Sequence, residues 1–349
     1  MNVSDFDFEL PVDLVAQEPP AERGASRLLW LERASGRVAH HRFADLPSLL
    51  RAGDLLVVND TRVFPARLIG QRLPGGGAAE CFLVRPTEVS DEWVALVHPG
   101  QRLREGSRMV FASGTHRLNA EVVGLHFQGR RTVRLWTDDR SSVRDAIDAI
   151  GHVPLPPYIK RSDAPADRER YQTVFARDRG SIAAPTAGLH FTQSLLDDLA
   201  GCGIQRTAVT LHVGYGTFQP IRVERIEDHQ MEAEHYEVTP ETAAALSAAR
   251  REHRRIIAVG TTSTRTLESL VIDSDGAVQP GCGETALFIH PGHQFRLVAG
   301  LVTNFHLPRS SLIILVSALA GREAVLAAYR AAVMQRYRFY SYGDAMLVL

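Results

Sequence analysis

Apolar and polar positions divide the chain into three stretches with different periodicities. In the first stretch, residues 46–50 have the spacing of a short helix. Residues 54–59, DLLVVN, form a continuous apolar run between Gly53 and the turn sequence NDTR. A short apolar run bounded in this way is typical of a buried strand.

The second stretch contains six short β-rich runs between residues 66 and 136, separated by glycine, proline and charged residues. They are RLIGQR, AECFLV, EWVALV, RMVFA, NAEVVGL and RTVRLW. Six strands at this spacing predict a small antiparallel barrel. Apolar residues then recur at helical spacing, and this pattern predicts a helix over 143–150 that ends at Gly151.

In the third stretch, from about residue 171, helices and strands alternate. Thr192 and the pair Thr239 and Pro240 are typical first residues of helices. The pattern predicts helices over 192–201, 240–255 and 310–320 and from Arg322 onward, and strands over 206–213, 256–259, 297–305 and 337–349. This alternation indicates an α/β core with a mixed sheet and helices.

Because strand 54–59 precedes the barrel, we expect the small antiparallel β-barrel to be an insertion. The predicted domains are a discontinuous α/β domain over residues 1–66 and 151–349, and a barrel domain over residues 67–150. A length of 349 residues suits two domains.

The charge balance changes this picture locally. The chain has 39 basic and 40 acidic residues, which excludes a uniformly basic binding arm but not a basic patch. Residues 67–134 contain ten arginines and six acidic residues. This excess would suit an RNA backbone, but a solvated face of an arginine-rich protein explains it equally well.

Several classes of protein are excluded by single features. Lys160, in PPYIKRSD, is the only lysine, so a P-loop lysine or a Schiff-base lysine is not expected. The first residues, MNVSDFDFELP, are acidic where a secretory leader would be basic and then apolar, so we expect no such leader. The longest apolar run, 312–320, is too short for a membrane span and predicts a buried helix. Cys81, Cys202 and Cys282 form no CxxC pair and are expected to be buried thiols in the cytoplasm.

A hydroxyl-rich segment, AVGTTSTRTLES, follows the strand 256–259. We expect a loop containing Thr261, Thr262, Ser263 and Arg265 to precede a helix here. Free backbone N–H groups, hydroxyl donors and the positive end of the helix dipole would together bind a carboxylate or phosphate. An ordinary helix cap is the simpler explanation, although one capping residue would suffice for that.

Histidines are placed at the predicted ends of strands or in loops: His190, His212, His229, His235 and His306. A histidine at such a position can be a general base, a metal ligand or a hydrogen-bonded core residue. The sequence has no HExxH motif, and HxxE at His229 is too short to indicate a metal, so we expect none. Several histidines at element ends favour a site.

Two further motifs are ambiguous. The glycines of GYGTF and GCGETA lack the strand and helix context of a dinucleotide fingerprint. The run QRYRFYSY could stack nucleic-acid bases, but its alternation favours a closing core strand.

Taken together, these motifs resemble one family over almost the whole chain, the S-adenosylmethionine:tRNA ribosyltransferase-isomerases of queuosine biosynthesis (the QueA family). The motifs that carry the resemblance are DFDFELP, GDLLVVNDTRVFPARL, GHVPLPPYI, YQTVFA, AAPTAGLHF, VTLHVGYGTFQP, IEDHQMEAEHYEV, AVGTTSTRTLES, LVTNFHLPRSSLIILVSALAG and YRFYSYGDAM. The barrel segment and Lys160 lie where members of this family vary. The RNA contacts of the barrel are therefore the least transferable expectation.

The resemblance implies an activity. The enzyme would transfer and isomerise the ribosyl group of S-adenosylmethionine onto preQ1 at the tRNA wobble position, giving epoxyqueuosine-tRNA, adenine and methionine. S-adenosylmethionine would be consumed as the ribosyl donor, with no other cofactor. The partners would be tRNA carrying preQ1 and S-adenosylmethionine, with no membrane, and the chain would act as a cytoplasmic monomer.

The same resemblance suggests roles for residues. A histidine would remove the C5′ proton that the sulfonium acidifies, and we rank His190 and His212 ahead of His306. Thr261, Thr262, Ser263 and Arg265 would hold the methionine carboxylate or a tRNA phosphate. The other expected substrate-binding residues, for adenine or preQ1, are Asp60, Arg62, Thr186, Asp228, His229 and Glu234.

Two alternatives remain open. An S-adenosylmethionine-dependent tRNA methyltransferase would release S-adenosylhomocysteine, although the glycine-rich loop expected after its first strand is missing. A non-catalytic RNA-binding protein would bind tRNA without consuming S-adenosylmethionine.

Overall fold

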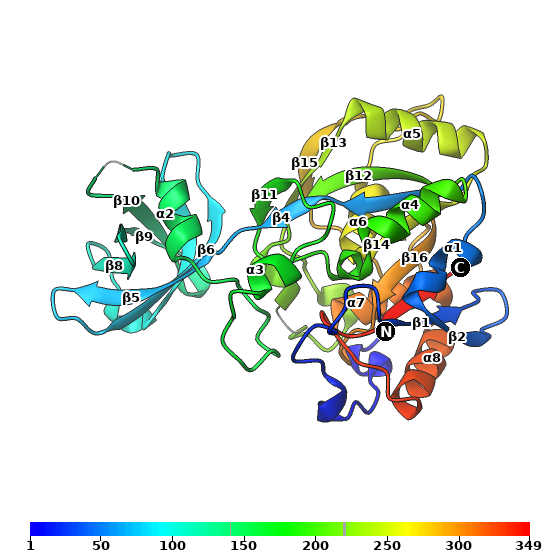
Figure 1. Cartoon of the computed structure of the whole chain (residues 1–349), viewed down its shortest axis with the longest axis horizontal. Helices are drawn as coiled ribbons and strands as arrows, with labels where there is room; N and C mark the ends of the chain where they lie inside the picture. Colours follow the sequence, from blue (N-terminus) through cyan, green and yellow to red (C-terminus); the bar gives the residue numbers. More distant parts are fainter. Residues whose placement is uncertain (140, 219–220) are drawn as a thin grey trace.

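The structure is a computed structural model that describes residues 1–139, 141–218 and 221–349. The described residues form a nine-stranded sheet, a closed barrel and a two-stranded sheet. Figure 1 shows the barrel as a separate lobe beside the larger α/β domain. This confirms the predicted fold class, a mixed α/β core with an inserted antiparallel barrel. The last two residues of the VTLHVGYGTFQP motif, Gln219 and Pro220, lie outside the described residues.

The central sheet is built around β3 (Leu55–Asn59), whose five residues are all buried. Its order is β15-β13-β12-β3-β14-β16-β17-β1-β2, and β12, β3, β14 and β16 run parallel. The bounds of the other strands are β1 Arg27–Leu31, β2 Val38–Arg42, β12 Gln205–Leu211, β13 Glu234–Val238, β14 Ile256–Val259, β15 Gly281–Thr285, β16 Val298–Asn304 and β17 Ala345–Val348. Strands covered on both faces are typically continuous apolar runs, as residues 55–58 of β3 are.

Alternate residues of β3 enter different cores, because neighbouring side chains of a strand point to opposite faces. Leu55 and Val57 pack with α5 (Pro240–Arg251), α6 (Gly260–Ser269), α7 (Ser311–Ala320) and α8 (Arg322–Met334). Leu56 and Val58 pack with α1 (Leu46–Leu49) and α4 (Gln193–Gly201). The α/β domain therefore has three layers, with the sheet between two groups of helices.

The barrel contains β5 to β10, all antiparallel, in the closed order β10-β7-β6-β5-β8-β9. Their bounds are β5 Arg67–Leu73, β6 Ala78–Pro86, β7 Glu92–His98, β8 Arg108–Ser113, β9 His116–Leu125 and β10 Arg130–Trp136. Helix α2 (Val143–Ile150) packs against β8 and β9, and the Ser142 side chain caps it by accepting from Asp145 N. Its buried residues Ala146, Ile147 and Ile150 join the barrel core, so the predicted helix is confirmed.

The chain enters and leaves the barrel through one narrow connection. Arg67 and His152 exchange backbone hydrogen bonds of 3.3 and 2.9 Å across it. Gly151 lies so close to the entering segment that a Cβ would be 2.1 Å from the Pro65 carbonyl oxygen. Beside this connection, β4 (Thr61–Val63) pairs in parallel with β11 (Asp178–Ser181), and α3 (Asp167–Arg170) follows the exit segment.

Four local expectations are wrong. The NDTR turn continues as the short strand β4, and α6 begins at Gly260 without an intervening loop. Residues 337–344 are not a strand: the last strand, β17, begins at Ala345, and Tyr340 adopts a left-handed φ of 72°. Cys81 is buried, whereas Cys202 and Cys282 are exposed.

The apolar run 312–320 lies in the buried helix α7, as predicted. Within the described ranges, no single helix is long and apolar enough to cross a membrane. Only α7 and α8 together meet those criteria, and the two are bent by 117° at their junction.

Candidate active site

The carboxyl ends of four neighbouring parallel strands meet at one edge of the central sheet. β12, β3, β14 and β16 end there at Leu211, Asn59, Val259 and Asn304. Ligands of open α/β sheets usually bind in crevices outside these strand ends. The candidate site occupies this edge.

A buried amide, that of Asn59, fixes the strand ends relative to one another. Its Nδ2 donates to Leu211 O at 3.0 Å and to Thr262 Oγ1 at 3.2 Å. Its Oδ1 accepts from Leu211 N at 3.0 Å and from Thr61 N at 3.1 Å. These four bonds satisfy the amide and join β3, β12 and α6. Nothing in the apolar pattern around Asn59 marks it as part of a site.

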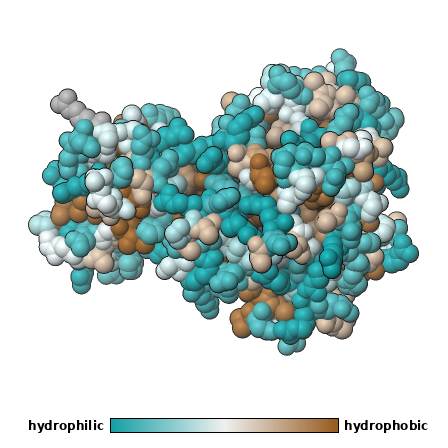
Figure 2. All heavy atoms as spheres, in the orientation of Figure 1, coloured by the Kyte–Doolittle hydropathy of each residue, from teal (hydrophilic) through white to brown (hydrophobic). Residues whose placement is uncertain are grey.

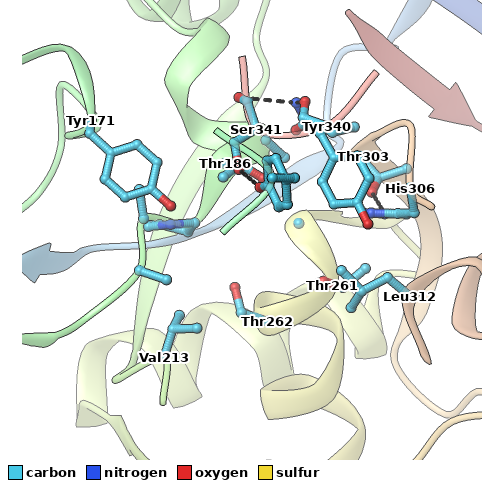
Figure 3. A pocket seen from close by; sticks show the side chains of 17 residues that line it. Tyr171, Thr186, Val213, Thr261, Thr262, Thr303, His306, Leu312, Tyr340 and Ser341 are labelled. Atoms are coloured by element: carbon cyan, nitrogen blue, oxygen red, sulfur yellow. Dashed lines mark hydrogen bonds between the residues drawn. The ribbon is translucent and has the colours of Figure 1, made fainter. Parts of the chain in front are cut away.

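A pocket opens over these strand ends (Figure 3). Its walls bound about 610 Å³ of space, part of it open to solvent. Three kinds of side chain line it: aromatic rings, short hydroxyl or amide groups, and small residues that leave room. They include Tyr158, Tyr171, Tyr340, Thr186, Thr261, Thr262, Thr303, Asn304, Ser341, His306, Ala183, Ala184, Ala187 and Gly260.

Helix α6 begins in the wall of this pocket, at Gly260, and its N-cap residue, Val259, provides no side-chain cap. The hydroxyls of Ser263 and Thr264 bond back to Val259 O at 2.8 Å and Gly260 O at 3.1 Å. Thr261 and Thr262 line the pocket instead. The helix start with these two threonines is therefore the part of the hydroxyl-rich segment that can meet an anion.

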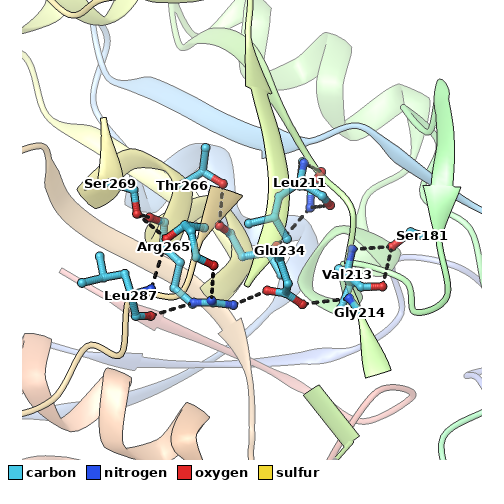
Figure 4. Close-up of polar contacts among 12 residues, drawn as sticks. Ser181, Leu211, Val213, Gly214, Glu234, Arg265, Thr266, Ser269 and Leu287 are labelled. Atoms are coloured by element: carbon cyan, nitrogen blue, oxygen red, sulfur yellow. Dashed lines mark hydrogen bonds and ion pairs between the residues drawn. The ribbon is translucent and has the colours of Figure 1, made fainter. Parts of the chain in front are cut away.

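Arg265 and Glu234 are brought together (Figure 4), but neither lines the pocket. They form a buried ion pair, whose side chains are 5% and 4% exposed. Arg265 also donates to Leu287 O at 2.9 Å and Thr285 O at 3.2 Å. Glu234 Oε1 accepts from Gly214 N at 2.8 Å, so the pair holds the loop after β12 that carries Val213 into the pocket.

Of the three candidate bases, His306 lines the pocket. Its Nε2 lies 2.8 Å from Thr303 Oγ1. Burial lowers the pKa of His306 to about 3, so the ring is neutral at physiological pH and can accept a proton.

His190 and His212 are close to the strand ends but do not line this pocket. His190 is buried with Nδ1 2.9 Å from Ser26 Oγ, and burial lowers its pKa to about 4. His212 Nδ1 lies 2.8 Å from Thr61 Oγ1, and its ring stacks on His235 with centroids 6.1 Å apart. Burial, followed by the neighbouring His235, lowers the pKa of His212.

The remaining expected residues are dispersed. Thr186 lines the pocket. Asp60, which directly follows Asn59 in the chain, is buried. It accepts a hydrogen bond from Thr210 Oγ1 at 2.7 Å and forms an ion pair with Arg177 at 3.1 Å. Burial raises the pKa of Asp60. Arg62 lines a different cleft, and Asp228 and His229 lie at a third hollow near Glu232.

The sequence pattern missed the tyrosines and Asn304. Tyr171 OH and Asn304 Oδ1 are buried polar atoms without a hydrogen-bond partner in the described structure, and both residues line the pocket. In Figure 3 the Tyr171 hydroxyl points into the cavity. The run QRYRFYSY did contain a signal, because Tyr340 and Ser341 belong to the pocket wall rather than to a closing strand.

No three or more His, Cys, Asp or Glu side chains are grouped to hold a metal ion in residues 1–139, 141–218 and 221–349.

Comparison with known proteins decides the family. The model of a family described as "Queuosine biosynthesis protein" matches residues 3–348. The chain belongs to the queuosine biosynthesis protein family. It is 51% identical, over the full length of both chains, to the S-adenosylmethionine:tRNA ribosyltransferase-isomerase of Symbiobacterium thermophilum. It is 53% identical to the enzyme of the same name from Anaeromyxobacter sp., over all of this chain and 99% of that one.

A solved structure supports the same family. The crystal structure of an S-adenosylmethionine tRNA ribosyltransferase from Thermotoga maritima is 37% identical, with a TM-score of 0.56, over 99% of this chain and 100% of that one. Membership of this family confirms the resemblance drawn from the motifs. S-adenosylmethionine and tRNA are the substrates that the names of these relatives imply.

Proposed function

We propose that this member of the queuosine biosynthesis family transfers and isomerises the ribosyl group of S-adenosylmethionine onto preQ1 at the tRNA wobble position. The products are epoxyqueuosine-tRNA, adenine and methionine. The observation that carries the proposal is the full-length identity of about half to enzymes named for this reaction. The pocket at the strand ends supplies polar and aromatic groups suited to it.

The first step is removal of the ribose C5′ proton, which the adjacent sulfonium acidifies. His306 is the candidate base because it lines the pocket and its ring is neutral. By itself, a pKa of about 3 makes it a weak base. A carboxylate bound nearby would raise that pKa towards the working range. His190 and His212 are the alternative bases.

The ylide then opens the ribose ring and expels adenine. The preQ1 amine attacks the opened sugar, and closure of the epoxide breaks the carbon–sulfur bond and releases methionine. No oxidant or reductant enters this sequence. S-adenosylmethionine is consumed as the ribosyl donor, and the reaction uses no further cofactor.

The start of α6 is the proposed anion site for the methionine carboxylate. Thr261 and Thr262 line the pocket there, and the side chains of the N-cap and of Ser263 leave the first N–H groups to the ligand. Arg265 acts through Glu234 and Gly214, and is a positioning residue rather than a ligand.

Tyr158, Tyr171 and Tyr340 supply aromatic surface for adenine or the deazaguanine base. Asn304 Oδ1 can accept from an exocyclic amine, because it lacks a partner within the described residues. We further propose that the chain acts as a cytoplasmic monomer and that its domain boundaries are 66/67 and 150/151.

Mass spectrometry of a reaction with purified protein, S-adenosylmethionine and tRNA carrying preQ1 tests the proposal. Adenine and methionine, together with a mass gain on the wobble base, are the expected products. S-adenosylhomocysteine would indicate a methyltransferase instead, and tRNA binding without turnover would indicate a binding protein.

The base is tested by single-turnover kinetics of His306→Gln, which keeps a group able to bond Thr303. We expect a loss of roughly 10²–10⁴-fold in rate, with tRNA affinity unchanged. His116→Gln, at an exposed position of the barrel, is the matched control. A full rate for His306→Gln would remove that residue from the mechanism and leave His190 and His212 to be tested in the same way.

A further inference from the structure

A second cleft lies between the barrel and the α/β domain, beside the narrow connection. It bounds about 950 Å³ of space, part of it open to solvent, and five arginines line it: Arg62, Arg144, Arg168, Arg177 and Arg179. They come from both lobes, because Arg144 lies on α2 of the barrel lobe and Arg62 on β4. Figure 2 shows hydrophilic residues over much of the waist between the lobes.

The local fold places these side chains together. β4 and β11 are paired in parallel, with Arg62 opposite Arg179. Residues opposite one another on paired strands point to the same face. Arg62 is exposed between the buried residues Thr61 and Val63, so its side chain lies on the solvent face.

The charges of this cleft are only partly compensated. Arg177 pairs with Asp60 and Asp178, and Arg179 pairs with Asp148 at 2.7 Å. Arg168 donates at 2.6 Å to the carbonyl oxygens of Asp148 and Gly151, which do not neutralise its charge.

Arg62 and Arg144 are the least committed of the five. Neither has an ion pair or hydrogen bond from its side chain in the part of the chain that the structure describes, and both are exposed. Together with Arg168, they direct three uncompensated positive charges at one cleft. A concave cationic surface concentrates an anionic partner more strongly than scattered exposed charges do.

The barrel surface, the expected basic face, is different. Five of its arginines already pair with carboxylates: Arg67 with Glu80, Arg108 with Glu121, Arg117 with Asp138, Arg130 with Glu232 and Arg134 with Glu92. Half of the ten arginines of residues 67–134 are therefore compensated pairwise. The cleft is the better anion surface.

The cleft is also next to the candidate active site. Tyr171 lines both the cleft and the pocket at the strand ends, and its side chain is 1% exposed. The cleft and the pocket are therefore adjoining hollows with Tyr171 in the wall between them.

We propose that the cleft binds the sugar–phosphate backbone of the tRNA next to the target nucleotide, with Arg62 and Arg144 contacting phosphates. The proposal rests on the proposed function, which makes tRNA the polyanionic substrate. Each phosphate contact that an arginine makes adds about 0.7–0.9 to the slope of log affinity against log salt concentration.

The test is to titrate unmodified tRNA transcript with full-length protein and to measure binding by fluorescence anisotropy at several KCl concentrations. The double variant Arg62→Gln/Arg144→Gln should bind roughly tenfold more weakly near physiological salt and lose roughly 1–2 from the salt slope. In steady-state assays the KM for tRNA should rise while the KM for S-adenosylmethionine stays unchanged.

Arg251→Gln/Arg330→Gln is the matched control. It removes the same charge from exposed positions on α5 and α8, away from the cleft (Figure 1). Equal weakening by both double variants, or an unchanged salt slope for Arg62→Gln/Arg144→Gln, would overturn the proposal. The unmodified transcript measures binding alone, and tRNA carrying preQ1 measures turnover. Wild-type protein that shows the expected salt slope with the transcript but forms no product from tRNA carrying preQ1 would contradict only the proposed function.

Discussion

Ion pairs of the two lobes are alike in chemistry and opposite in environment. In the barrel, Arg108 and Glu121 face each other across β8 and β9, with 59% and 27% of their side chains exposed. In the α/β domain, Arg265 and Glu234 are 5% and 4% exposed. The exposed pair is screened by water, whereas removing either partner of the buried pair would leave the other charge buried and uncompensated. Only the buried pair also holds a wall of the candidate site.

Removing the cation from each pair tests this difference between the lobes. Arg265→Met leaves Glu234 buried without its cation, and we expect the α/β domain to lose about 3–5 kcal/mol of unfolding free energy. Arg108→Met should cost at most about 1 kcal/mol. Urea unfolding followed by tryptophan fluorescence measures the two losses separately. In a Trp93→Phe/Trp136→Phe background, Trp30 of β1 reports on the α/β domain. In a Trp30→Phe background, Trp93 and Trp136 report on the barrel. Similar losses in the two lobes would refute the comparison.

The connection between the lobes gives a smaller effect. A Cβ at Gly151 would be 2.1 Å from a backbone oxygen that cannot move independently, so Gly151→Ala should destabilise the barrel by about 1–3 kcal/mol. Gly100→Ala is the control in the same lobe, because no atom lies within 4 Å of its added Cβ. Urea unfolding followed by Trp93 and Trp136 measures the difference. An unchanged midpoint for Gly151→Ala would show that the connection can relax.

A third effect depends on pH. Burial holds the pKa of His190 at about 4 and that of His306 at about 3, below the roughly 6.5 of an unfolded histidine. The unfolded chain therefore takes up protons first as the pH falls. The stability of the α/β domain should decrease below about pH 6.5, by up to about 1.4 kcal/mol per pH unit for each histidine.

His190→Gln should remove one of these two contributions and flatten the dependence of stability on pH between 6.5 and 5. The measurement is the urea midpoint of the α/β domain at pH 7, 6 and 5. The same slope in wild type and variant would show that His190 is not buried in its neutral form.

Local signals in the sequence were sufficient for most of the fold. Thr192 and Thr239 cap α4 and α5 through their hydroxyls, as expected from their positions. Four of the six barrel pairings join consecutive strands, whose alternation and turns specify them, whereas β5–β8 and β7–β10 join strands distant in the chain. The start of α6 was missed because a run of threonine and serine usually indicates a loop. Here Ser263 and Thr264 bond to carbonyls four residues earlier and remain in the helix.

The sequence indicates where the site lies, but not which side chains face the ligand. Strand ends in parallel sheets predict where ligands bind, and Thr186, Thr261, Thr262 and His306 do line one pocket. Arg265 was expected to face the ligand, but its partners, Glu234 and the carbonyls of Thr285 and Leu287, come from other segments. The periodicity of a helix does not indicate whether an arginine on it will face the ligand or a carboxylate from another segment.

The position of β3 also sets an order of events during synthesis. This apolar strand leaves the ribosome before the barrel, yet its neighbours β12 and β14 begin only at Gln205 and Ile256, about 150 and 200 residues later. At roughly 5–20 residues per second, β3 waits on the order of ten seconds or more for a partner, while the barrel has every strand it needs. The nascent chain therefore contains a barrel whose strands are all synthesised and, at the same time, an unpaired hydrophobic strand. We expect a chaperone that binds the nascent chain to bind at β3.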